Sequence, residues 1–241
     1  MKEYTFENIL EVDAFLKSID ILVPQRSEGR KTEHTERYSI VNYLDQFKND
    51  IFTDFPVQLI HYDKPDFRIL SKNKSIGIEV TESIPEQLAR ATVLLEKHFP
   101  NGGILEPEFF GWNTPDRTND EIVEILKKSN DRLIGQPSYG KSIEKNWIQG
   151  IHECIINKTK KLNQYDFDKF MMNWLLIYDN QIKIFLDTEY VENSLYIVLD
   201  NYFGKEEKYI FDRIVILSGK YFYSIETENV STVNIITRNV I

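Results

Sequence analysis

Hydrophobic and polar positions follow two different periods along this chain, and the two periods predict where helices and strands lie. Apolar residues at helical spacing predict helices over Phe6–Ile19, Thr32–Phe47, Pro85–His98, Asp120–Lys128, Ser142–Asn163 and Ser194–Tyr202. Alternating or continuous apolar runs predict strands over Val57–Tyr62, Pro65–Leu70, Ser75–Thr81, Asn173–Tyr178, Tyr209–Leu217 and Tyr221–Ile225. Because helices and strands are interleaved in this order, the pattern predicts an α/β protein with one mixed central sheet flanked by helices.

The chain contains no internal repeat, low-complexity tract or Gly/Ser-rich linker, so we expect residues 1–241 to form a single domain. Within this domain, the core is expected at about 32–179. A helical and loop insertion is expected at about 84–140, and a C-terminal extension of helix and strands at 180–241.

Composition and charge narrow the class of protein. The chain has 41% hydrophobic and 28% charged residues, as an ordinary globular protein does. It lacks an apolar run of the roughly 20 residues that span a bilayer, its first residues lack a signal-peptide core, and its single cysteine, Cys154, excludes an internal disulfide. We therefore expect a cytoplasmic protein without a membrane partner. The net charge of −9 argues against nucleic-acid binding by the whole surface but is compatible with a local basic groove.

The segment from Asp63 to Glu82 has the pattern of a β-hairpin with a turn at Lys72 and Asn73. The apolar pairs that set its register are Ile69 with Ile76 and Phe67 with Ile78. The same register places Asp66 opposite Glu79. The apolar pairs alone therefore predict that two carboxylates face each other.

Two directly opposed carboxylates destabilise a hairpin unless a cation lies near them or one of them has a raised pKa. Carboxylate oxygens suit Mg²⁺, which commonly takes one or two protein carboxylates together with waters and phosphate oxygens. Pro65 is tolerated at the start of its strand, and Gly77 is expected to leave room for a ligand. A pair of acidic side chains that is simply solvated is the competing interpretation.

The spacing of Pro65-Asp66 and Glu79 resembles the motif of the PD-(D/E)XK nuclease superfamily, and the expected element order resembles its αβββαβ core. The resemblance implies that Asp66 and Glu79 bind Mg²⁺, or Mn²⁺ in its place, with help from the backbone carbonyl of Val80. It also implies a lysine that activates the attacking water. Thr81 occupies the position of that lysine, so the positive charge must come from elsewhere if the site is active.

Two lysines of the helix over Ser142–Asn163 are candidates for this charge. Lys158 falls within the apolar stripe of the helix, where a charged side chain needs a partner, and Lys161 lies about one turn further on. Alternatively, Lys158 extends past the edge of the sheet into solvent, and Lys160 and Lys161 cover a solvated face. The resemblance also implies an acidic residue on the preceding helix, for which Glu36 is preferred to Glu33.

Arg68 and Thr81 are candidate substrate-binding residues. Arg68 lies two residues from Asp66 on the same face of the hairpin, where it either contacts a substrate phosphate or neutralises the acidic pair.

The resemblance implies a Mg²⁺-dependent nuclease that hydrolyses phosphodiester bonds, with DNA favoured over RNA as the expected substrate. A non-catalytic protein of the same fold, acting as a binding or regulatory subunit, is the alternative that Thr81 and the acidic charge favour. A metal enzyme acting on a small phosphorylated substrate is a third interpretation. Both a homo-oligomer and a larger bacterial complex are compatible with the chain.

Overall fold

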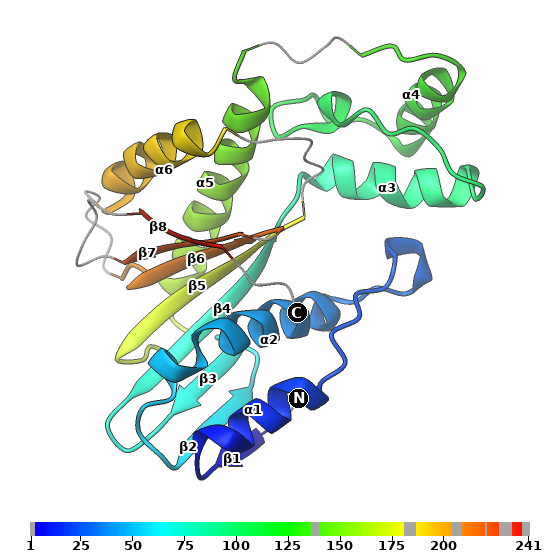
Figure 1. Ribbon diagram of the computed structural model, residues 1–241. Coiled ribbons are helices and arrows are strands. Elements are labelled where there is room, and N and C mark those ends of the chain that lie inside the picture. Colours follow the sequence, from blue (N-terminus) through cyan, green and yellow to red (C-terminus); the bar gives the residue numbers. More distant parts are fainter. Residues whose placement is uncertain are drawn as a thin grey trace.

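The computed structural model describes residues 3–135, 140–180, 187–203, 209–219, 221–226 and 233–237, and shows helices on both faces of one sheet (Figure 1). The strands are β1 (Glu3–Phe6), β2 (Val57–His61), β3 (Phe67–Leu70), β4 (Ser75–Ser83), β5 (Met172–Asp179), β6 (Arg213–Ser218), β7 (Tyr221–Glu226) and β8 (Val233–Thr237). They lie side by side in the order of the sequence. The pairs β4–β5 and β5–β6 are parallel and all the others are antiparallel, so the sheet is mixed, as expected.

Each parallel pair requires a crossover connection, and a helix supplies each one. Helices α5 (Ser142–Leu162) and α6 (Thr188–Phe203) lie on one face of the sheet and close these two crossovers. Helices α1 (Ile9–Ser18) and α2 (Thr32–Ile51) cover the opposite face (Figure 1). No helix among the described residues is long and apolar enough to cross a membrane.

Strand β4 lies in the middle of the sheet, with α1 and α2 on one face and α5 on the other. Its residues Ile76, Ile78 and Val80 pack with α1 and α2 into one apolar core. Because side chains alternate along a strand, Glu79 points to the other face, toward α5. The alternation therefore places an acidic side chain on the face of the sheet where Leu175 and Ile177 join the apolar core under α5 and α6.

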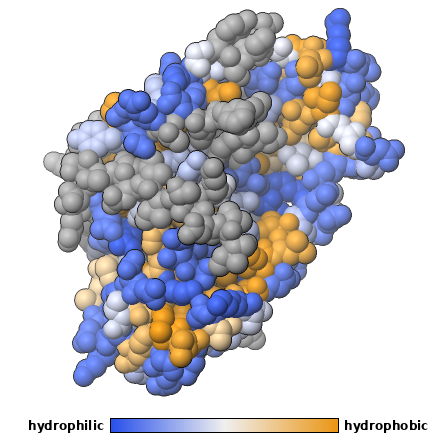
Figure 2. All heavy atoms as spheres, in the orientation of Figure 1, coloured by the Kyte–Doolittle hydropathy of each residue, from blue (hydrophilic) through white to orange (hydrophobic). Residues whose placement is uncertain are grey.

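Between β4 and α5 the chain forms a helical insertion with a small core of its own. It contains α3 (Glu86–His98), the short helix η2 (Pro107–Phe110) and α4 (Asn119–Asp131). Its buried apolar residues are Leu88, Ala91, Phe110, Ile122 and Leu126. Large exposed apolar side chains include Val93, Ile104 and Leu133, and the face drawn in Figure 2 shows hydrophobic side chains gathered over this insertion at upper right.

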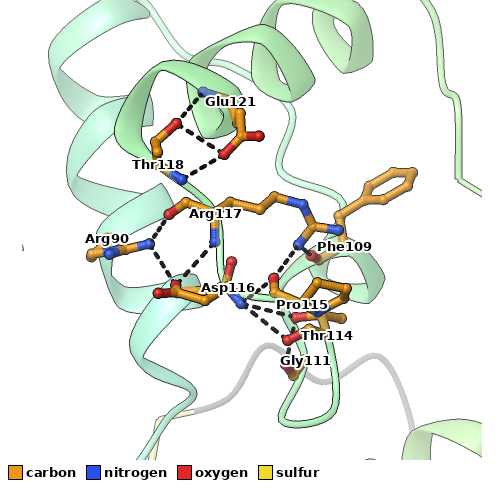
Figure 3. Close-up of polar contacts among 10 residues, drawn as sticks. Arg90, Phe109, Gly111, Thr114, Pro115, Asp116, Arg117, Thr118 and Glu121 are labelled. Atoms are coloured by element: carbon orange, nitrogen blue, oxygen red, sulfur yellow. Dashed lines mark hydrogen bonds and ion pairs between the residues drawn. The ribbon is translucent and has the colours of Figure 1, made fainter.

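Two arginines join the loop of the insertion to its helices (Figure 3). The Arg90 guanidinium, from α3, donates to the Asp116 carboxylate at 3.2 Å and to the carbonyl of Arg117. The Arg117 guanidinium donates in turn to the Phe109 carbonyl at 2.5 Å. These bonds tie the long loop to α3, which lies beside the short helix η1 (Arg26–Glu28) that precedes α2.

The hairpin prediction is confirmed, since β3 and β4 pair in the expected register with Phe67 opposite Ile78. Other boundaries differ. Strands β1 and β8 were not predicted, and the first helix begins at Ile9 because the Asn8 side chain accepts the N–H groups of the first turn. Helix α6 begins at Thr188, earlier than predicted, and β6 begins only at Arg213. Parts of the expected extension 180–241 lie outside the described residues.

Candidate acidic site

Asp66 is held at the point where the hairpin ladder ends. It lies immediately before β3, so the predicted strand from Pro65 was too long, and the last ladder pair is Phe67 with Ile78. Strand β4 continues beyond this pair, and the Val80 N–H donates to Asp66 Oδ2 at 2.7 Å. The N–H and C=O of one strand residue point to the same edge, so the Val80 carbonyl faces the edge where Asp66 lies.

Glu79 is fully buried and receives two lysines. The Nζ atoms of Lys158 and Lys161, both on α5, lie 2.6 Å and 2.7 Å from Glu79 Oε1. The second oxygen of Glu79, Oε2, is buried and has no hydrogen-bond partner among the described residues. The structure therefore brings together four of the residues that the sequence singled out, and neither lysine covers a solvated face.

The surroundings of Asp66 favour its protonated form. Burial and the charge of Glu79 raise the pKa of the Asp66 carboxyl to about 7, against the opposing effects of the Val80 N–H and Lys158. Burial acts to lower the pKa of Lys161, but its hydrogen bond to Glu79 and the nearby carboxylates outweigh burial, and the pKa is raised. Without a metal, Asp66 is therefore largely protonated below about pH 7, beside the lysine-paired Glu79.

Glu36 reaches the same region from the first turns of α2. Its Oε2 lies 3.2 Å from His61 Nε2, and its charge makes a small contribution to the raised pKa of Asp66. The His61 ring stacks on Phe67 with 4.8 Å between centroids. The sequence interpretation missed His61, although it occupies the inward position that follows Val57 and Leu59 in the alternation of β2.

Arg68 is not the partner of the acidic pair. Its Nη2 donates to Asp168 Oδ2 at 2.5 Å, and its guanidinium carbon lies 3.4 Å from the centroid of the Tyr62 ring. The two lysines of α5 supply the neutralising charge that was considered for Arg68. A contact of Arg68 with substrate remains a prediction.

Two other positions close to the site have local roles in packing. A Cβ atom added to Gly77 would lie 2.7 Å from a ring carbon of Phe170, so the space expected there for a ligand is already filled. Thr81 lies beside Cys154 of α5, whose thiol has its pKa raised to about 11 by burial, and the Thr81 hydroxyl opposes this shift slightly. The Thr81 side chain therefore faces α5, the helix from which Lys158 reaches Glu79.

The donor set fits a hard divalent cation that keeps several waters. No three His, Cys, Asp or Glu side chains in the described part of the chain form a cluster that could hold a metal on their own. Mg²⁺ needs only one or two carboxylates. Asp66 and Glu79 could supply them together with the Val80 carbonyl, and a cation would give the buried Glu79 Oε2 a partner that no described residue provides.

Comparison with known proteins identifies no family model, curated protein or solved structure that matches this chain. The interpretation of the site therefore depends on its geometry and chemistry.

Proposed function

We propose that this protein is a Mg²⁺-dependent nuclease that hydrolyses phosphodiester bonds in DNA. The observation that carries the proposal is the fully buried Glu79, which lies beside Asp66 and holds two lysines on one oxygen. Its other oxygen has no partner in the part of the chain that the structure describes. A buried carboxylate with an unpaired oxygen is costly to folding, so a retained one indicates a ligand for that oxygen.

In the proposed mechanism, Asp66 and Glu79 hold Mg²⁺ or Mn²⁺. A bound ion of this kind lowers the pKa of a water and polarises the scissile phosphate. Asp66 must lose its proton to act as a ligand. Because its pKa is about 7, this deprotonation costs little free energy at neutral pH. The Val80 N–H keeps one oxygen of Asp66 fixed, which orients the other.

Lys158 and Lys161 provide the positive charge that a nuclease of this type needs. In the PD-(D/E)XK superfamily, which this chain resembles, the lysine follows the glutamate by two positions on the same strand. This chain has Thr81 at that position. Both lysine Nζ atoms nevertheless lie within hydrogen-bond distance of Glu79. Fixed cations at this point would stabilise the charge that develops on the phosphate oxygens in the transition state. Glu36 would complete the acidic cluster from α2.

The proposal is tested by cleavage of supercoiled plasmid, single-stranded DNA and RNA by the purified protein with Mg²⁺ or Mn²⁺. We expect Asp66→Asn and Glu79→Gln each to reduce the cleavage rate at least about a hundredfold, with Asp63→Asn as the exposed control. Calorimetry should show metal binding that both variants lose. Absence of cleavage and of metal binding would refute the proposal and favour a binding or regulatory subunit.

A further inference from the structure

A cavity of about 160 Å³ adjoins the acidic site on the side of α2. Its walls come from η1 and the loop after it, from the start of α2, and from the end of β4. It shares Glu36 and Val80 with the acidic site. The residues that line the rest of it include Arg26, Arg30, Lys31, Thr32, Thr81 and Glu82.

Two largely buried arginines line this cavity, and neighbouring side chains hold them in place. Arg26 and Arg30 have side chains 19% and 11% exposed, and each donates from Nη2 to Glu82 Oε1, at 2.6 Å and 2.9 Å. Arg30 also donates to the Thr35 hydroxyl. A guanidinium has five N–H donors, so each arginine retains donors beyond these bonds. The arginines are thus preorganised for a second acceptor of negative charge.

The first turn of α2 adds further donors at the same cavity. The residue that precedes the helix is the exposed Lys31, whose carbonyl accepts the His34 N–H at 3.1 Å. A lysine side chain has no acceptor with which to cap the remaining N–H groups of the first turn, those of Thr32 and Glu33. Uncapped N–H groups and the positive end of the helix dipole favour an anion. Three cationic side chains and two carboxylates, those of Glu36 and Glu82, line the cavity, so its net side-chain charge is positive.

We infer that this cavity binds the terminal phosphate of a nucleic-acid strand. This inference rests on the proposed nuclease function and deepens it. A phosphate monoester offers three oxygens to arginine and helix N–H donors, which is the recognition that guanidinium groups perform best. A volume of about 160 Å³ suits a phosphate group and its waters. The attached strand would leave past Glu36 and Val80, toward Asp66 and Glu79, so the enzyme would act close to a phosphorylated end.

The test measures binding in EDTA, where no cleavage occurs. Fluorescent oligonucleotides of one sequence carry a 5′-phosphate, a 3′-phosphate or only hydroxyl ends, and anisotropy gives the dissociation constants. We expect one phosphorylated end to bind about tenfold tighter than the hydroxyl-ended strand, and inorganic phosphate to remove the difference. Lys31→Ala should reduce the preference severalfold, whereas Lys128→Ala, an exposed lysine of α4, should leave it unchanged. Arg30→Lys keeps the positive charge but loses the planar set of guanidinium N–H donors, so it should also weaken the preference for the phosphorylated end.

Equal affinity for phosphorylated and hydroxyl ends would overturn the inference, as would an unchanged preference in both Lys31→Ala and Arg30→Lys. A circular strand that competes as well as the phosphorylated linear strand would overturn it too, because internal phosphates would then occupy the cavity. Cleavage of DNA without a preference for phosphorylated ends would refute the phosphate-binding inference and leave the proposed nuclease function intact. An end preference in a protein that never cleaves would support the cavity and refute the nuclease.

Discussion

Replacement of Asp66 by asparagine should stabilise the metal-free protein at neutral pH. The folded protein holds a proton on Asp66 up to a pKa of about 7, whereas the unfolded chain releases it near the ordinary aspartate pKa of 3.8. Between these two pH values the unfolded state therefore binds fewer protons, and the free energy of unfolding falls as pH rises. Asparagine is neutral at every pH and still offers an oxygen to the Val80 N–H.

The size of the effect follows from the difference between the two pKa values. About 3 pH units at roughly 1.4 kcal/mol per unit correspond to about 4 kcal/mol at pH 7 and above. For a chain of 241 residues this is a rise in melting temperature of roughly 10 °C. Below about pH 4, where both states of the wild-type protein are protonated, Asp66→Asn and wild type should unfold with nearly equal free energies.

The assay is urea and thermal unfolding in EDTA at pH values from about 4 to 8. Asp63→Asn, a matched change at an exposed neighbour, should give a small difference without this pH dependence. If the difference between Asp66→Asn and wild type stays constant across the range, Asp66 is ionised in the folded protein and the reasoning fails. Added Mg²⁺ should narrow the gap by stabilising only the wild type, since ligand binding stabilises the folded state.

Three further experiments test the packing of the site. Lys158→Met should cost about 1–3 kcal/mol, and less when Glu79→Gln is also present; additive costs would show that the two side chains do not interact. Gly77→Ala should cost about 1–3 kcal/mol because its Cβ meets Phe170, and Phe170→Leu should recover part of this in a double variant. Cys154 should resist a thiol reagent at pH 8 until urea unfolds the protein, since burial raises its pKa to about 11; fast labelling of the folded protein would contradict that burial.

The sequence by itself determined the parts of the site that depend on neighbouring residues. Strand alternation sets the register of a hairpin, so the apolar pairs were enough to set Phe67 opposite Ile78, and Asp66 and Glu79 are the residues that come next to this last pair. Helical periodicity likewise placed Lys158 on the face of α5 that points to the sheet, because a charge within an apolar stripe requires a buried partner. Both predictions use a periodicity of apolar positions that can be read from a few contiguous residues.

Only the tertiary structure decided the contacts between distant segments. Arg68 pairs with Asp168, which is 100 positions away, and the Phe170 ring that fills the space above Gly77 comes from the same distant loop. Glu36 of α2 contacts His61 at the end of β2. No spacing in the sequence encodes such pairs, because the path of the chain across the sheet decides which loops meet. The cavity between the η1 segment, α2 and β4 arises for the same reason.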